Sequence, residues 1–265
     1  TDFESKREWK RDVSSGFRLG LERAMSSAHA YPQAPDIETA SDEYAKRFSG
    51  DVGAWFLQVQ EEVTLRMLEP YPEATVLDVG GGHGQITKPL VEHGYSVTVL
   101  GSAQVCCKQI QDYVDAGRCE FEVGNISNMP FDDESFDIVV SYRTMAHVPE
   151  WRSFVRELAR VSRECVLVDY PDTRSFNLMK ELFFFLKKRV EENARKYRLF
   201  GSGSIESEFG RNGMECFEKY RQFFWPMFIH RWAQSEEVSR VADEVCRRVG
   251  LSGVFGSPVI AKFVD

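Results

Sequence analysis

The sequence predicts an α/β fold built on a doubly wound, mostly parallel sheet of seven strands. Three observations predict this fold. Short apolar runs alternate with helical patterns from residue 74 to residue 196, and a glycine-rich turn joins the first run to its helix. A chain of 265 residues with 43% hydrophobic content is also long enough to bury one such core plus an elaboration. In sheets of this kind the ligand binds at the carboxyl ends of the strands.

The N-terminal part, residues 1–70, is predicted to form helices outside the sheet. A peripheral helix is expected from Phe3 to about Met25, and a loop that contains two prolines follows it. A second helix is indicated by apolar residues at positions 55, 56, 59, 63, 65, 67 and 68. We expect this part to act as a lid or extension of a domain that spans 71–265.

The central and C-terminal parts supply the strands and the helices that connect them. Strands are predicted at 74–80, 95–101, 119–124, 136–142 and 163–170, with two short final strands at 252–257 and 258–264. Helices are predicted near 84–93, 103–115, 149–161, 174–196 and 235–249. Residues from about 174 to 234 read as an insertion before the last helix, and we expect this insertion to form a substrate cap.

The turn after the first strand carries the strongest functional signal. Asp78 ends the apolar run, and glycine then recurs at every second position, at Gly80, Gly82 and Gly84. Glycine accepts unusual backbone angles and lets a ligand approach without a Cβ in the way. A dinucleotide-binding fingerprint would require its third glycine at position 85, where the chain has Gln85. This departure disfavours a nicotinamide oxidoreductase.

The spacing D-x-G-x-G-x-G resembles motif I of the class I S-adenosylmethionine (SAM)-dependent methyltransferases, which have a Rossmann-like fold. The resemblance implies that the turn backbone holds the methionine end of SAM and that the acid orders the turn and reaches the amino group. It implies S-adenosylhomocysteine (SAH) as the product. The cofactor contacts implied here are Asp78, Gly80, Gly81, Gly82, Gly84 and Gln85.

The end of the second strand departs from the family pattern. The family places an acid there for the ribose hydroxyls, whereas this chain reads Gly101-Ser102-Ala103-Gln104. Ser102, Gln104 or the backbone alone are the alternatives for holding the ribose. Because a carboxylate that accepts two hydroxyls is a strong contact, we expect an aspartate installed at position 101 to tighten cofactor binding.

Two further motifs follow the third and fourth strands. Gly124-Asn125-Ile126 resembles the stretch that reads the adenine amino group, and capping a turn is the alternative role of Asn125. The fourth strand ends in Ser141-Tyr142-Arg143, three further candidate cofactor contacts, and the pattern H-V-x-(D/E)-W begins at His147. These motifs extend the resemblance over residues 74–170. The motifs of amino-methylating nucleic-acid enzymes and of cytosine C5 enzymes are absent from this stretch.

The candidate catalytic residue is His147, just past the fourth strand. Methyl transfer needs a general base only when the acceptor must lose a proton, and imidazole titrates near neutral pH. Ordering the loop at the start of the next helix is the alternative role of this residue.

The candidate substrate residues are mainly aromatic. Residues 220–232 read Y-R-Q-F-F-W-P-M-F-I-H-R-W, a density that favours a pocket for an apolar or aromatic acceptor. A dimer interface or simple core packing is the competing explanation. The substrate candidates are Tyr44, Phe48, Tyr170, Phe224, Trp225 and His230.

Charge and composition exclude several partner classes. A net charge of −8 gives no general attraction to phosphate backbones, so we expect no nucleic-acid partner. No apolar run is long enough to span a bilayer, and we expect no membrane partner. The six cysteines show no metal-ligand spacing, so we expect no metal and reduced thiols in a cytoplasmic protein. Cys106-Cys107 reads as helix packing, with a redox pair as the alternative.

Together these features predict a SAM-dependent methyltransferase that acts on a small apolar or aromatic acceptor, with O-methylation slightly favoured and a homodimer as a candidate assembly. The rival is a non-catalytic module of the same fold that binds a ligand or partner. Measured binding of SAM would separate a catalytic protein from a module that lacks the cofactor.

Overall fold

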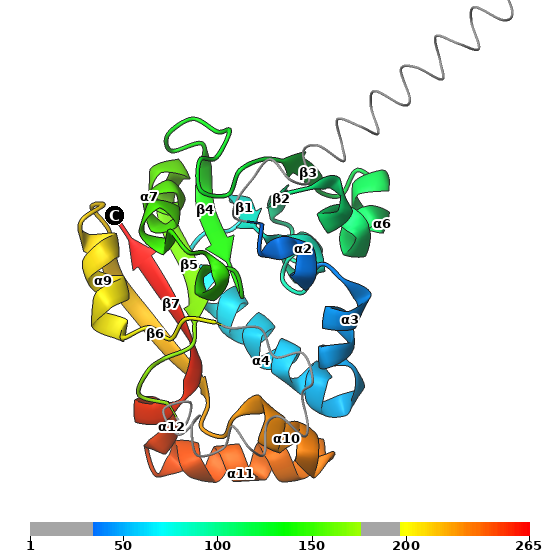
Figure 1. Cartoon of the computed structure of the whole chain (residues 1–265), viewed down its shortest axis with the longest axis vertical. Coiled ribbons are helices and arrows are strands. Elements are labelled where there is room, and N and C mark those ends of the chain that lie inside the picture. The colour runs from blue at the N-terminus through cyan, green and yellow to red at the C-terminus, as the bar shows by residue number, and fades with distance from the viewer. Residues whose placement is uncertain (1–33, 176–196) are drawn as a thin grey trace, which may run out of the picture.

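The computed structural model describes residues 34–175 and 197–265. The helix predicted at Phe3–Met25 and most of the one predicted at 174–196 lie outside the described residues. The described chain forms one seven-stranded sheet in the order β3-β2-β1-β4-β5-β7-β6 (Figure 1). Its strands are β1 (Thr75–Val79), β2 (Ser96–Gly101), β3 (Glu120–Val123), β4 (Phe136–Ser141), β5 (Ser162–Tyr170), β6 (Glu215–Phe223) and β7 (Ser257–Val264).

The strand pairing confirms the predicted fold class. Strands β1 to β5 pair in parallel, and β7 runs antiparallel between β5 and β6. The order changes direction at β1, where β2 lies on one side and β4 on the other. Ligands of such sheets bind at this switch point, beyond the carboxyl ends of the strands.

Most of the described helices are short, and three of them have more than ten residues: Gly50–Leu68, Trp151–Val161 and Glu236–Arg248. The α-helices are α2 (Asp36–Thr39), α3 (Asp42–Ala45), α4 (Gly50–Leu68), α5 (Thr87–Glu92), α6 (Gln111–Asp115), α7 (Trp151–Val161), α9 (Ser202–Gly210), α10 (Met227–Ala233), α11 (Glu236–Arg248) and α12 (Leu251–Phe255). The 3₁₀ turns are η1 (Lys46–Phe48), η2 (Gly81–His83), η3 (Gln104–Ile110) and η4 (Met145–His147).

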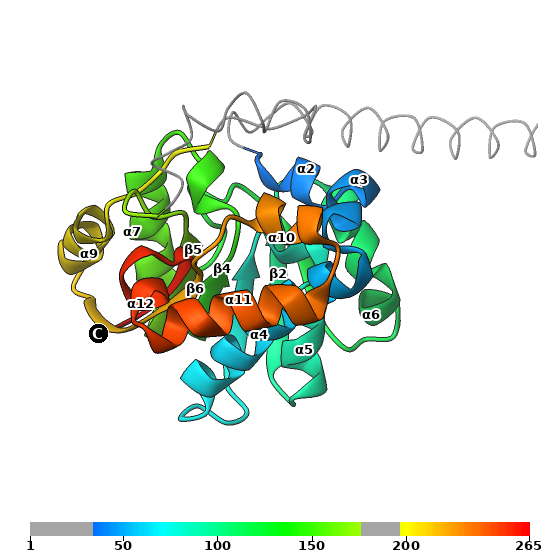
Figure 2. The same cartoon turned by 90° about the horizontal axis from the view of Figure 1, so that it is seen from below.

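Both faces of the sheet are buried, as the near-continuous apolar strands require. On one face α7 and α9 pack through Phe154, Leu158 and Phe209. On the other, α4 and α5 pack through Met67 and Leu90. Helices α10, α11 and α12 lie together beside α4 at one end of the molecule (Figures 1 and 2).

Of the two strands predicted at the end of the chain, the first, 252–257, is wrong, and the second, 258–264, is confirmed. Residues 251–255 form the helix α12, and one longer strand, β7, takes the rest. The remaining strand is β6, inside the segment predicted to be an insertion. It was missed because an edge strand carries charged residues: Glu215, Glu218, Lys219 and Arg221 interrupt the apolar signal.

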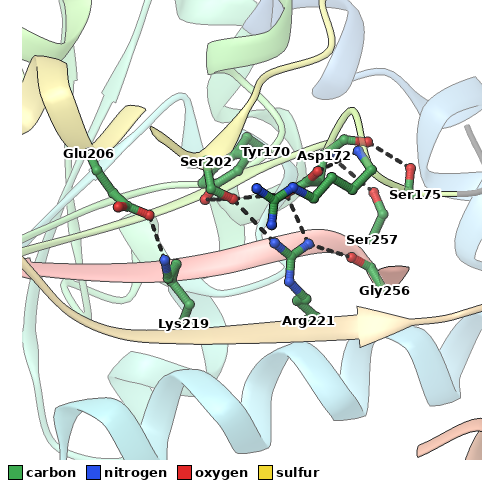
Figure 3. A network of polar contacts seen from close by, with 10 residues as sticks. Tyr170, Asp172, Ser175, Ser202, Glu206, Lys219, Arg221, Gly256 and Ser257 are labelled. Carbon is green, nitrogen blue, oxygen red and sulfur yellow. Dashed lines mark hydrogen bonds and ion pairs between the residues drawn. The ribbon is translucent and has the colours of Figure 1, made fainter. Parts of the chain in front are cut away.

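A buried ion pair fixes β6 and β7 to the end of β5. The Asp172 carboxylate lies 2.9 Å from Arg221 Nη1, and the Asp172 side chain is fully buried. Ser202, at the start of α9, donates to the same carboxylate, and the Arg221 guanidinium also donates to the Gly256 carbonyl (Figure 3). The network therefore ties β5, β6, α9 and the start of β7 into one unit next to the carboxyl end of the sheet.

Candidate functional site

The glycine turn has the backbone that its sequence requires. Gly80 and Gly84 both lie in the left-handed region, with φ of 77° and 71°, and they bracket η2 between β1 and α5. A residue with a Cβ is strained in this region, so glycine is needed at both places. The Gly80 N–H donates to the Leu100 carbonyl at 2.8 Å and so ties the turn to β2.

Asp78 lies beneath this turn and is almost completely buried. Its Oδ2 accepts a 2.6 Å hydrogen bond from the Thr87 hydroxyl, whereas Oδ1 has no partner among the described residues. Burial raises the pKa of Asp78 to about 7, against the effect of the Thr87 bond. An unpartnered buried carboxylate oxygen costs free energy, and an ammonium or N–H donor would satisfy it. The turn therefore fits the amino group of a SAM molecule.

The other side of the turn lies against atoms of the chain itself. A Cβ on Gly82 would lie 2.0 Å from the Cys106 carbonyl oxygen, and one on Gly80 would lie 2.5 Å from the Thr144 hydroxyl. Packing against η3 and against the end of β4 therefore already requires glycine at these two positions of the turn. Cys106 and Cys107 are buried and unpaired, as expected of packing residues.

The end of β2 has no room for the acid that the family places there. A Cβ on Gly101 would lie 2.7 Å from the ring of Phe121 and 3.0 Å from the Cys106 Cβ. The expectation that an aspartate at 101 would fit and tighten binding therefore meets a steric obstacle. Ser102 and Ala103 are also buried, and Ser102 is bound by the carboxylate of Asp36.

The predicted adenine-binding stretch forms a tight turn. Asn125 Oδ1 accepts from the Ser127 N–H at 2.9 Å, which is the capping role weighed against adenine recognition. Because the adenine amino group is a donor, Asn125 would have to accept from it through the second acceptor position of the same oxygen. Gly124 packs against Leu100 and Pro130, and Ile126 is fully buried.

Ser141, the last residue of β4, and Tyr142, which follows it, bind different parts of the scaffold. The Ser141 hydroxyl donates to the Val79 carbonyl at 2.9 Å, and the Tyr142 hydroxyl lies 2.8 Å from the Thr64 hydroxyl in the α4 face of the core. Both side chains are buried and bind other parts of the scaffold. The structure thus gives Ser141 and Tyr142 supporting positions below the predicted cofactor site.

Arg143 is the residue of this stretch that reaches the cavity. It has a left-handed backbone, with φ of 60°, which is costly for a residue with a long side chain. Its guanidinium donates to Gln85 and, at 2.7 Å, to Gln60. The guanidinium carbon also lies 4.0 Å from the centre of the Phe48 ring. Two residues predicted to be near the cofactor, Gln85 and Arg143, are therefore brought together.

A cavity of about 250 Å³ opens next to Arg143, at the carboxyl ends of β4 and β5. Six of the predicted site residues line it: Tyr44, Phe48, Arg143, His147, Phe224 and Trp225. These residues come from the N-terminal helices, from η4 and the loop that precedes it, and from the segment after β6. The cavity is therefore built by segments far apart in the sequence.

Tyr170 and His230 have other surroundings. The Tyr170 hydroxyl donates to Ser202 at 3.2 Å within the network of Figure 3. The His230 ring packs edge-on against Trp55 and Phe56, and burial lowers its pKa to about 4. The structure gives both residues core positions and does not place them on the cavity wall.

Asp169 is the main cavity residue that sequence reasoning missed. It is 4% exposed, lies at the end of β5 and accepts a hydrogen bond from the Arg143 N–H. Burial raises its pKa to about 6, although the Arg143 charge and hydrogen bond lower it. The available signal was an acid that directly follows the apolar run Val166-Leu167-Val168. Arg47 and Gln222 line the same cavity and were also missed.

Other kinds of site find no support in the described residues. Residues 34–175 and 197–265 contain no cluster of three or more side chains suited to a metal ion. Within the same ranges, no helix combines the length and the apolar character needed to cross a bilayer.

Comparisons with known proteins agree with the geometry of this edge of the sheet. Residues 77–165 match a family model described as a methyltransferase domain. Phthiotriol/phenolphthiotriol dimycocerosates methyltransferase of Mycobacterium tuberculosis is 35% identical over 38% of this chain and 38% of its own length. The matched part is thus well under half of that relative.

Two other similar proteins match over longer stretches. O-methyltransferase resE of Aspergillus sclerotiorum is 26% identical over 57% of this chain and 69% of its own length. The magnesium protoporphyrin IX methyltransferase ChlM of Synechocystis, solved with bound SAH, superposes with a TM-score of 0.58 at 14% identity. That superposition covers 84% of this chain and 93% of ChlM.

The family match, the strand order and the glycine turn coincide on the same residues. Residues 77–165 therefore match a methyltransferase domain, and the described chain has the fold of the SAH-bound methyltransferase ChlM.

Proposed function

We propose that this protein transfers a methyl group from SAM to a small apolar or aromatic acceptor, with an oxygen as the favoured methylated atom. One observation carries the proposal. The cavity beside the carboxyl ends of β4 and β5 combines aromatic walls, including Phe48 and Trp225, with the buried carboxylate of Asp169. Aromatic walls suit an apolar or aromatic acceptor, and the polar groups among them, such as Arg143 and Asp169, would orient it.

The cofactor would be held by the glycine turn and the neighbouring strand ends. Asp78 would accept from its amino group, Gly80 to Gly84 would provide the close backbone, and Asn125 would contact the adenine. When bound, SAM supplies an already activated methyl group. The chain's own task is to hold the acceptor in line, exclude water and accept a proton where one is lost.

Two residues on the cavity wall are candidates for the proton-accepting role. His147 has the position predicted from the sequence. Burial raises the pKa of Asp169 to about 6, so its carboxylate is ionised at neutral pH although the side chain is only 4% exposed. A hydroxyl acceptor must lose its proton to a base. A carboxylate in the position of Asp169 therefore supports methylation of an oxygen.

The relatives support a small-molecule acceptor without identifying it. One is named for phthiotriol and phenolphthiotriol dimycocerosates and another is an O-methyltransferase. We further propose that, of the predicted lid at 1–70 and cap at about 174–234, the described parts 34–70 and 197–234 cover the cavity; residues 1–33 and 176–196 lie outside the described residues. Tyr44 and Phe48 of the lid, and Phe224 and Trp225 of the cap, line the cavity from opposite parts of the chain.

The proposal is tested by incubating the protein with SAM and a panel of phenols, aliphatic alcohols and amines. Mass spectrometry should show one acceptor class gaining a methyl group while SAH accumulates in equal amount. Asp169→Asn is the matched variant and should lose most of the turnover while it still binds SAH. Absence of methylated product from every class, with SAM bound, would favour the rival function.

That rival is a non-catalytic module that binds a ligand within the same fold. The observation in its favour is the packing of the Cys106 carbonyl on Gly82, together with Gly101 in place of the usual acid. A module without cofactor would show no heat on titration with SAM or SAH, whereas the enzyme would bind both.

Self-association and location stay predictions. Within the described residues, helix α11 exposes Val238, Val241 and Val245 on one face, a surface that a homodimer would bury. Light scattering of the wild type and of Val241→Glu would show whether this face pairs. We propose a cytoplasmic location and no nucleic-acid partner; the net charge of −8 and the absence of disulfides among the six cysteines support this proposal.

A further inference from the structure

Asp36 is a carboxylate buried at the end of β2. It opens the short helix α2, 66 positions before Ser102, and its side chain is 1% exposed. Its Oδ2 accepts from the Ser102 N–H at 2.7 Å and its Oδ1 from the Ser102 hydroxyl at 2.6 Å. The N-terminal segment therefore delivers a carboxylate to the residue that follows Gly101.

The carboxylate lies between the glycine turn and the end of β2. The Asp36 Cβ is 3.5 Å from the place that a Cβ on Gly80 would take, and α2 contacts both η2 and η3. These two elements are the ones that follow β1 and β2 at their carboxyl ends. Asp36 therefore occupies the crevice between two adjacent parallel strands, where ligands of such sheets bind.

The place that a carboxylate on β2 itself would need is filled. The Phe121 ring and the Cys106 Cβ lie within 3.0 Å of a Cβ built on Gly101. An acidic residue at position 101 is therefore incompatible with the observed packing of Phe121 and Cys106. A carboxylate can reach this point of the crevice from another segment, and α2 provides one.

The bonds to Ser102 leave the carboxylate with further capacity. An ionised carboxylate offers about four acceptor positions; Ser102 uses two of them, and the Cys106 thiol also bonds to the Asp36 side chain. In the described residues no ion pair joins Asp36 to a lysine, arginine or histidine, and the donors recorded for it are neutral. A ribose hydroxyl that reached a remaining position would add a charge-assisted bond to it.

We propose that Asp36 is the residue that holds a ribose hydroxyl of the cofactor, in place of the acid missing at position 101. This inference rests on the proposed SAM-dependent function and adds to it a binding residue from the N-terminal segment. The segment that carries Tyr44 and Phe48 over the acceptor cavity would then also carry a cofactor ligand. Binding the cofactor and ordering the lid would be one event.

The test is calorimetric titration of the full chain with SAH and with an SAH analogue that lacks both ribose hydroxyls. We expect Asp36→Asn to weaken SAH binding about ten- to a hundredfold, because the amide carries no charge and accepts through one oxygen. Removing the hydroxyls from the ligand should cost the wild type a similar factor. It should cost Asp36→Asn little, since the partner is already lost.

The matched control is Asp42→Asn on the same segment. Asp42 is an exposed acid that binds Lys108 and Gln109, so it also ties the segment to η3. We expect SAH affinity within about twofold of wild type. If Asp36→Asn melts below the assay temperature, Asp36→Glu keeps the charge and should keep the dependence on the ribose hydroxyls.

The outcomes separate this inference from the function beneath it. Equal or tighter SAH binding by Asp36→Asn would overturn the inference, and tighter binding would show that Asp36 competes for the site. Equal losses from the missing hydroxyls in both proteins would overturn it as well. No SAH binding by the wild type would overturn the proposed function and the inference together.

Discussion

The backbone N–H of Arg143 donates a 2.5 Å hydrogen bond to Oδ1 of Asp169 and so joins the ends of β4 and β5 at the cavity wall. Arg143 has a left-handed backbone at this point, with φ of 60°. The bond holds a buried carboxylate in place beside the cavity, where burial raises its pKa to about 6. A group with this pKa changes its charge between mildly acidic and neutral pH.

The first prediction concerns pH and activity. If Asp169 accepts the acceptor's proton, kcat/KM should rise with pH through about 6, because the ionised form is the base. Asp169→Asn should remove this rise, and His147→Gln should retain it. Loss of the rise in His147→Gln, with Asp169→Asn unchanged, would assign the base to the histidine.

The raised pKa of Asp169 also predicts how the free energy of unfolding changes with pH. Burial raises the folded pKa of Asp169 to about 6, above its ordinary value of 3.8, so the folded protein binds more protons between about pH 4 and 6. Its contribution to the free energy of unfolding is therefore present below pH 4 and is lost as the pH rises through about 6. Urea unfolding across this window should show a weaker pH dependence in Asp169→Asn than in wild type. An identical dependence would contradict the buried position.

The second prediction compares two glycine-to-alanine substitutions. Gly82→Ala would place a methyl group 2.0 Å from the Cys106 carbonyl oxygen, whereas a Cβ on Gly203 meets nothing within 4 Å. We expect Gly82→Ala to lower the melting temperature and abolish SAH binding. Gly203→Ala, in a helix, should be neutral or stabilising by up to about 1 kcal/mol. Wild-type SAH affinity in a folded Gly82→Ala would contradict a cofactor site at this turn.

The third prediction reverses what the sequence alone suggests. Gly101→Asp should not tighten SAH binding, because its Cβ would collide with the Phe121 ring. We expect a lower melting temperature and weaker binding. The double variant Gly101→Asp, Phe121→Ala removes the obstacle and should recover part of the affinity. Tighter binding by the single variant would show that the ring moves at little cost.

The fourth prediction concerns the buried pair of Figure 3. Removing one partner of a buried ion pair leaves an uncompensated charge, so Arg221→Met should lower the free energy of unfolding by about 3–5 kcal/mol. Lys219→Met on the same strand is the control, because its partner Glu206 is partly exposed and such a pair contributes about 0–1 kcal/mol. Urea unfolding of both variants measures the difference, and equal losses would contradict the role of the pair.

The residues found from the sequence and those missed differ in a physical way. The glycine turn was predictable because Gly80 and Gly84 serve a local backbone conformation that the spacing itself records. Asp36 and Asp169 were missed because their roles depend on long-range contacts, to Ser102 and Arg143 respectively. The strand β6 was missed for a related reason, since its pairing with β7 outweighs a charged local pattern.

The fifth prediction decides between pocket and core for the aromatic segment after β6. Phe224 and Trp225 are partly exposed and line the cavity, whereas Phe223, which also lines it, is 1% exposed and packs on Trp55 and Phe56. Phe224→Ala and Trp225→Ala should therefore reduce acceptor turnover and raise the acceptor KM while SAH affinity stays within about twofold of wild type.

Phe223→Ala is the control with the opposite signature. Losing this buried ring should lower the free energy of unfolding by roughly 3–5 kcal/mol and reduce every activity together. Thermal melting and SAH titration on the three variants separate the two patterns. If Phe224→Ala and Trp225→Ala melt as low as Phe223→Ala and lose SAH binding in parallel, the segment stabilises the core. The acceptor would then have to be held by the lid residues Tyr44 and Phe48 on the other side of the cavity.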